Sequence, residues 1–136
     1  MNRWNSHYIK TAYIVFELNF DIRLYGDNTD LRRWLVKNEI KSWAFITAWN
    51  PGSKLKSVKK NQAANAQLMS DLKSLNLNFW PGIGKALEGD WIPEASYFVV
   101  DITEKRAMEL ALRYGQNAFV FGYTQSKPQL IFTDSD

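Results

Sequence analysis

The chain has 136 residues, 46% of them hydrophobic, and a net charge of +3, which suits one domain with an ordinary core. It has no cysteine and a single histidine, His7, which excludes a disulfide framework, a thiolate nucleophile and a histidine-rich zinc site. Because no secretory leader or membrane-crossing stretch is recognisable, we expect a cytoplasmic protein with no metal and no membrane association.

The N-terminal part predicts a strand–strand–helix unit. Residues 8–18 have the period of a strand, with one face formed by Ala12, Ile14, Phe16 and Leu18 and the other by Tyr13, Val15 and Glu17, and residues 21–25 predict a second strand. Residues 26–29 then break the pattern and offer capping groups for a short helix, which has Leu31, Trp34 and Leu35 on one face.

Residues 42–50 are apolar on both faces, which is typical of a central strand. Trp43, Phe45, Thr47 and Trp49 share one face, and Ala44, Ile46 and Ala48 share the other. Pro51 and Gly52 end this strand, and Ser57 can cap a helix that reaches about Leu75. The buried stripe of that helix is Ala64, Leu68, Met69, Leu72 and Leu75, and Asn61 and Asn65 extend it toward the helix start.

The second half predicts strands at residues 77–80 and 97–102, with a bend at residues 81–84 between them. Thr103 can cap a helix through Tyr114, and Gly115 stands where a left-handed C-terminal cap is needed. Residues 118–123 and 129–133 predict a closing hairpin.

This order predicts the fold. From Ser42 to Tyr123 it is strand, helix, strand, strand, helix, strand, which is the split βαβ arrangement of ferredoxin-like folds. We therefore predict one α+β domain over residues 1–136, with an antiparallel or mixed sheet, the N-terminal unit and an added C-terminal strand. In this topology we expect the two central strands to be parallel and the last strand of the motif to run antiparallel beside the first.

That topology gathers polar side chains at one sheet edge. The candidate ligand-binding residues are Trp49, Asn50, Ser53, Asn61, Asn65, Gln116 and Asn117. Core-facing amides cost free energy unless something bonds them, and amides read the donor and acceptor pattern of a ligand without charge. A small polar, nucleotide-like ligand fits this set, with Trp49 as a stacking surface. An equally good interpretation is that the amides cap backbone groups and satisfy one another.

Charge is unevenly distributed. Residues 1–60 carry 11 Lys and Arg against 5 Asp and Glu, whereas residues 61–136 carry 6 against 9. The densest basic cluster is Lys54, Lys56, Lys59 and Lys60, beside the amide-bearing region, where it would attract an anion. The simpler interpretation is a solvated surface, because lysines are mostly exposed.

The run from Ser42 to Pro51 carries a family resemblance, together with more scattered matching positions. These positions are Tyr8, Thr11, Tyr13, Ser53, Asn61, Asn65, Trp91, Glu94, Ser96 and residues 115–118. On them the chain resembles, over nearly its whole length, a bacterial uncharacterised family, domain of unknown function 3293. The resemblance implies a shared site but names no reaction. Since the predicted topology puts Glu94 at the edge opposite Asn50, either the site is elongated, or the strand order differs, or Glu94 and Trp91 only fasten a turn.

Two other functions compete with ligand binding. An enzyme acting on a nucleotide or related metabolite would use Glu94 or Asp101 as acid or base. No sequence spacing, however, brings Glu94 together with Asp101, or His7 together with Ser53. A nucleic-acid-binding module would use the basic front half and a sheet face of stacked aromatic rings. Those rings are Trp43, Phe45, Trp49, Phe119, Phe121 and Tyr123. Burial of this face under the N-terminal unit explains the aromatic residues more simply.

The leading hypothesis is therefore a cytosolic domain that binds or sequesters a small polar, nucleotide-like ligand at its Asn- and Gln-rich sheet edge. No cofactor is implied, and the pattern sets neither the oligomeric state nor whether the host is a bacterium or a phage.

Overall fold

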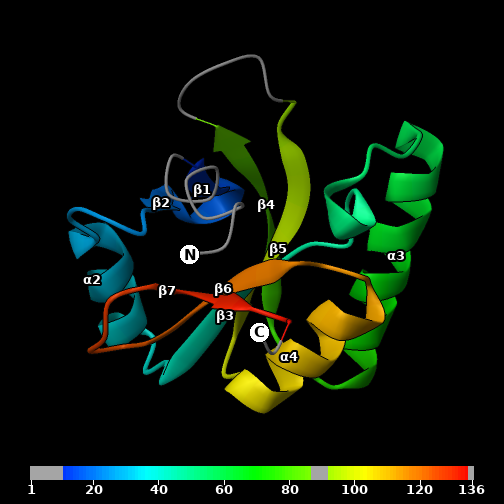
Figure 1. The fold of residues 1–136 in the computed structure, drawn as a ribbon. Helices are drawn as coiled ribbons and strands as arrows, with labels where there is room; N and C mark the ends of the chain where they lie inside the picture. Colours follow the sequence, from blue (N-terminus) through cyan, green and yellow to red (C-terminus); the bar gives the residue numbers. More distant parts are fainter. Residues whose placement is uncertain (1–10, 87–91, 135–136) are drawn as a thin grey trace.

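The computed structural model describes residues 11–86 and 92–134 (Figure 1). Over these residues the chain is α+β, as predicted, with three α-helices and a curled seven-stranded antiparallel sheet. The elements in order are β1 (Thr11–Val15), the 3-10 helix η1 (Phe16–Leu18), β2 (Phe20–Ile22), α2 (Thr29–Lys37), β3 (Ser42–Ile46), the 3-10 helix η2 (Pro51–Ser53), α3 (Val58–Ser74), β4 (Phe79–Ala86), β5 (Glu94–Val100), α4 (Glu104–Arg113), β6 (Ala118–Tyr123) and β7 (Gln129–Phe132).

Local capping chemistry sets the helix ends, as the sequence predicted. The Oγ of Ser57 accepts a hydrogen bond of 3.1 Å from the backbone N–H of Lys60, at the start of α3. Thr103 does the same for the N–H of Arg106 at the start of α4. Gly115 follows α4 with a φ of 65°, the left-handed conformation that ends many helices. These three predictions are confirmed.

The sheet order is β2-β1-β4-β5-β3-β6-β7. The prediction of parallel central strands is wrong, because β3 pairs with β5 in antiparallel register, from Trp43 opposite Val100 to Ile46 opposite Tyr97. The C-terminal end of β3 therefore lies beside the start of β5, whereas the predicted topology put these two strand ends at opposite edges of the sheet. β3 is also shorter than the predicted strand and ends at Ile46, four residues before Asn50.

β4 replaces the predicted bend. It runs without interruption through residues 81–84 and pairs with β1 on one side and β5 on the other. Gly82 makes this possible, because a Cβ there would lie 2.2 Å from the carbonyl oxygen of Ile14 and 3.1 Å from the Phe45 ring. A glycine within a strand can mark the close approach of another backbone instead of a bend, and here the approaching backbone is β1.

Helices cover both faces of the sheet (Figure 1). On one face α3 and α4 pack on Ala44, Ile46 and Phe121. The other face carries Trp43 and Phe45, which are buried under α2 and the curled β1–β2 hairpin. The N-terminal unit thus covers these two rings, as the simpler interpretation expected.

The six predicted aromatic residues do not share one face. β6 pairs antiparallel with β3, so that Val120 lies opposite Phe45 and Phe121 lies opposite Ala44. Phe119 and Phe121 therefore belong to the core on the α3–α4 face. The prediction of one sheet face whose aromatic rings stack RNA bases is consequently wrong.

Candidate ligand-binding cavity

Side chains replace the backbone ladder where the chain leaves the sheet after Ile46. The Oγ1 of Thr47 donates to the carbonyl oxygen of Ala95 at 2.7 Å, and the Nδ2 of Asn65 donates to the same oxygen at 2.8 Å. The Oδ1 of Asn65 accepts from the N–H of Ala48 at 2.8 Å. Asn65 thus bridges the diverging ends of β3 and β5 and satisfies backbone groups that the ladder no longer pairs.

Asn50 is held by a second set of hydrogen bonds. It has a φ of 47°, a left-handed conformation that asparagine adopts more readily than most residues. Its Oδ1 accepts from the Nδ2 of Asn61 at 2.8 Å and from the N–H of Lys56 at 3.0 Å, and its own N–H donates to the Oδ1 of Asn61 at 2.8 Å. With the carbonyl oxygen occupied by two donors, the Nδ2 of Asn50 points to the Oε2 of Glu94, 3.3 Å away.

The remaining predicted residues hold η2 and the start of β6 together. The Nε2 of Gln116 donates to the carbonyl oxygen of Trp49 at 3.1 Å, and the Nδ2 of Asn117 donates to the Oγ of Ser53 at 2.9 Å. All seven residues of the predicted cluster therefore lie at one edge of the sheet. Their amides, however, bond mainly to the protein itself, so most of the cluster shapes the site and does not present free groups.

A cavity of about 410 Å³ opens beside this cluster on the sheet face that carries Phe45. Trp49, Asn50, Ser53, Asn61 and Gln116 line part of it, whereas Asn65 and Asn117 do not. Gly84 lies opposite both Tyr13 and Glu94, and a Cβ there would have no neighbour closer than 3.8 Å. The missing side chain leaves space next to Glu94, and the volume is in the range of small-molecule sites.

Glu94 is the acidic group among the described residues that line the cavity. Burial raises its pKa above the ordinary value, and the hydrogen bond from Asn50 offsets part of that effect. Within residues 11–86 and 92–134 no Lys or Arg forms an ion pair with this carboxylate. Glu94 is half-buried, and a carboxylate withdrawn from solvent is usually paired, so an unpaired one in a cavity marks a candidate functional group.

The antiparallel pairing of β3 and β5 explains why Glu94 lies here. The sequence analysis expected it at the edge opposite Asn50, and the hydrogen bond between the two residues corrects that expectation. Ser96, two residues further along β5, faces the same cavity. Successive side chains of residues 94–100 point to alternate faces of the sheet. With the correct pairing of β5 and β3, this alternation could have placed Glu94 and Ser96 on the Phe45 face.

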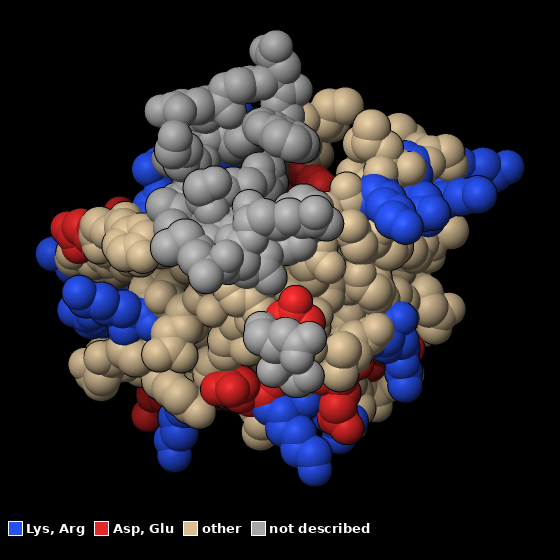
Figure 2. All heavy atoms as spheres, in the orientation of Figure 1, with Lys and Arg blue, Asp and Glu red and all other residues tan. Residues whose placement is uncertain are grey.

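The predicted basic cluster lies near the start of α3, and one of its members reaches the cavity. Lys54, Lys56, Lys59 and Lys60 are exposed, and Figure 2 shows basic side chains gathered beside the start of α3. Lys56 itself lines the cavity. The site thus combines a half-buried acceptor with one lining lysine and three further lysines close to it in sequence.

Asp101, the other candidate acid or base, lies at the far end of β5. It stands seven positions after Glu94, a distance of about 23 Å along an extended strand. Its Oδ1 accepts a hydrogen bond of 3.3 Å from the N–H of Lys41. It therefore does not belong to this cavity, and the predicted residues His7, Tyr8 and Trp91 lie outside the described part of the chain.

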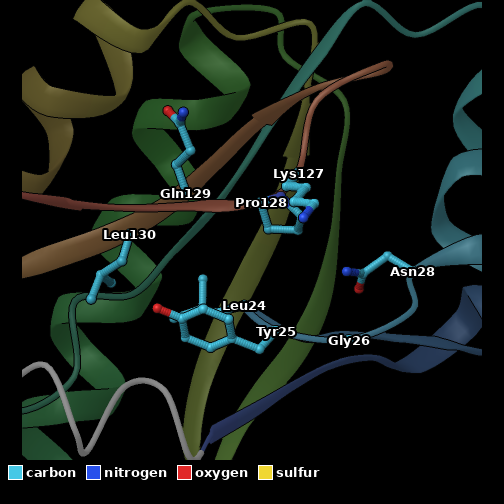
Figure 3. A pocket seen from close by; sticks show the side chains of 8 residues that line it. All are labelled: Leu24, Tyr25, Gly26, Asn28, Lys127, Pro128, Gln129 and Leu130. Carbon is cyan, nitrogen blue, oxygen red and sulfur yellow. The ribbon is translucent and has the colours of Figure 1, made fainter.

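A second hollow of about 470 Å³ lies between residues 24–28 and 127–130 (Figure 3). The amide of Asn28 is fully engaged there, because it accepts from the N–H and donates to the carbonyl oxygen of Arg23, both at 2.9 Å. Tyr25 and Lys127 are exposed. With no buried charged group in its walls, this hollow is the weaker candidate.

No three His, Cys, Asp or Glu side chains of residues 11–86 and 92–134 are grouped so that they could hold a metal ion. None of the helices seen there has the length and apolar character that a membrane span requires.

Comparison with known proteins gives a family without an assigned activity. Residues 46–119, more than half of the chain, match the family described as Protein of unknown function (DUF3293). The match includes the whole amide cluster and Glu94, but not β1. No curated protein and no solved structure matches the chain.

Proposed function

We propose that this protein, which belongs to the DUF3293 family, binds or sequesters a small polar, nucleotide-like molecule in the cavity beside Glu94. The observation that carries this proposal is the carboxylate of Glu94, which receives one hydrogen bond from Asn50 and has no cationic partner among the described residues. A desolvated, unpaired charge destabilises a fold, and the donors of a bound ligand would offset that cost.

The amide cluster has a supporting role in this proposal. Asn61 fixes Asn50, and Asn50 in turn orients Glu94, so the acceptor is held in place before a ligand arrives. Asn65 and Gln116 hold the backbone of the cavity wall. We propose that Trp49, Asn50 and Glu94 contact the ligand and that the other amides maintain the shape of the site.

Ligand-observed NMR with a library of small polar heterocycles tests the proposal. Gly84→Val places a branched side chain in the cavity and should abolish binding of fragments that bind the wild type. Glu17→Gln, on an exposed residue outside the cavity, is the matched control and should bind like the wild type. If Gly84→Val binds the same fragments with unchanged affinity, this cavity is not the binding site.

An enzyme is the second candidate, because a carboxylate whose pKa is raised by burial suits general acid–base catalysis near neutral pH. In this case Glu94 would transfer a proton to or from a bound metabolite. Turnover that disappears in Glu94→Gln while binding persists would support the enzyme, and unchanged turnover would remove Glu94 from any reaction.

We also propose that β3, α3, β4, β5, α4 and β6 form a ferredoxin-like core. The strand order β4-β5-β3-β6 supports this assignment, because β5 lies between the two strands that α3 connects.

A further inference from the structure

Resting on the function proposed above, this inference names the ligand class: we propose that the cavity recognises a guanine-type base through Glu94, with an anionic substituent such as a phosphate directed to Lys56. The proposal depends on three properties of the site, namely the hydrogen-bonding pattern of Glu94, the walls of the cavity and the charge beside it.

The hydrogen-bonding pattern follows from the fixed orientation of Asn50. Because the Oδ1 of Asn50 is held by two N–H donors, its Nδ2 faces Glu94, so the Oε2 of Glu94 acts as an acceptor. No described residue donates to the other carboxylate oxygen, Oε1. Glu94 therefore offers acceptors on both oxygens, and their partner is a ligand edge with two adjacent N–H donors.

Guanine has such an edge, formed by its ring N1–H and its exocyclic amino group, and the ionised carboxylate can accept from both at once. Adenine and cytosine instead place a donor beside an acceptor. Their ring nitrogen would face a carboxylate oxygen without a proton between them, which is repulsive. The same cavity should therefore discriminate strongly among the bases.

The walls of the cavity suit a planar ring. Tyr13, Phe45 and Trp49 contribute aromatic surface, and Trp49 is half-buried beside the opening. Tyr13 and Phe45 meet edge to face, with ring centroids 5.3 Å apart, so they form a continuous wall. At about 410 Å³ the cavity is large enough to enclose a purine ring.

The charge beside the cavity favours an anionic group and disfavours a simple cation. Lys56 lines the cavity, Lys54 is exposed two residues before it, and α3 begins at Val58, which also lines the cavity. The N-terminal end of a helix and nearby ammonium groups attract a phosphate. A guanidinium or amine could also donate to Glu94, but the ammonium groups of Lys54 and Lys56 would repel such a cation.

Isothermal titration calorimetry with three nucleoside monophosphates tests the base. We expect guanosine monophosphate to bind at least about tenfold more tightly than inosine monophosphate, which lacks the exocyclic amino group and so one charge-assisted hydrogen bond. Adenosine monophosphate should bind more weakly still. Methylguanidinium, which offers donors without the ring or the phosphate, should bind more weakly than guanosine monophosphate.

Glu94→Gln provides a readout that a purely structural residue would not give. A glutamine amide offers an acceptor beside a donor and matches adenine, so the preference should reverse toward adenosine monophosphate. Lys56→Gln should weaken guanosine monophosphate but leave guanosine unchanged. Lys73→Gln, near the other end of α3, is its control and should change neither affinity.

The possible failures are distinguishable. Equal affinities for the guanine and adenine nucleotides, tighter binding of methylguanidinium, or an unchanged preference in Glu94→Gln would overturn the guanine assignment. Failure of all three nucleotides to bind the wild type would overturn it as well. The proposed function fails separately, if fragments bind Gly84→Val as they bind the wild type.

Discussion

Replacing Asn65 with alanine tests whether the amide cluster supports the fold. The change leaves the N–H of Ala48, a fully buried residue, without an acceptor, which costs about 1–3 kcal/mol. It also removes one of the two donors to the carbonyl oxygen of Ala95, for about 1 kcal/mol. Alanine favours the helix more than asparagine and returns about 0.5 kcal/mol.

We therefore expect Asn65→Ala to lower the free energy of unfolding by about 1.5–3.5 kcal/mol, a sizeable part of the 5–15 kcal/mol typical of a domain. Urea unfolding followed by tryptophan fluorescence measures it, provided that the dependence on urea concentration is unchanged. Gln62→Ala removes an exposed amide from the same helix and should change the free energy of unfolding by less than about 0.5 kcal/mol.

A loss in Asn65→Ala no greater than that in Gln62→Ala would refute this reasoning. It would mean that the ends of β3 and β5 do not need the bridge, and that the amide is available for a ligand. The site would then have to be redefined with Asn65 as a contact residue.

Two further predictions concern stability. Burial raises the pKa of Glu94 in the folded state above its ordinary value of 4.5, so ionisation of this carboxyl opposes folding. The stability that is present below pH 4.5 is therefore lost as the pH rises through the folded pKa. Urea unfolding should therefore show Glu94→Gln gaining stability over the wild type at pH 8 but not at pH 4, and an equal difference at both pH values would contradict the charge argument. Gly82→Ala should destabilise by at least about 2 kcal/mol, because its Cβ would meet the carbonyl oxygen of Ile14. A Cβ on Gly84 would make only ordinary van der Waals contacts, the nearest at 3.8 Å, so equal melting temperatures for Gly82→Ala and Gly84→Ala would contradict this prediction.

The helices were predictable because their signals are local. Ser57, Thr103 and Gly115 act on backbone groups within a few residues, so their roles can be read from the order of residues alone. The strands were less predictable where a distant partner decides the outcome. Gly82 indicates a bend until the approach of β1 is known, and Phe121 is assigned to the wrong face until its register against Ala44 is known.

The same division explains the candidate site. The sequence located the amide cluster correctly, because core-facing asparagines are visible as a break in the apolar stripe of α3. It could not show that the partners of Asn65 are Ala48 and Ala95, which come from two strand ends and are 17 and 30 residues away along the chain. For the same reason it could not pair Glu94 with Asn50, 44 residues apart.

The contrast between amides whose hydrogen bonds are satisfied and a carboxylate that has one weak partner supports the proposal that Glu94 contacts a ligand. Asn61 and Asn65 use both the donors and the acceptor of their amides within the protein, so adding a ligand would gain them little. Glu94 receives one hydrogen bond of 3.3 Å and is left desolvated beside an open volume next to Gly84. In a purely structural site, the use of amides to orient a carboxylate that destabilises the fold would bring no gain in stability. The uncompensated charge of Glu94 therefore supports the proposed binding site more strongly than the satisfied amides at the same edge do.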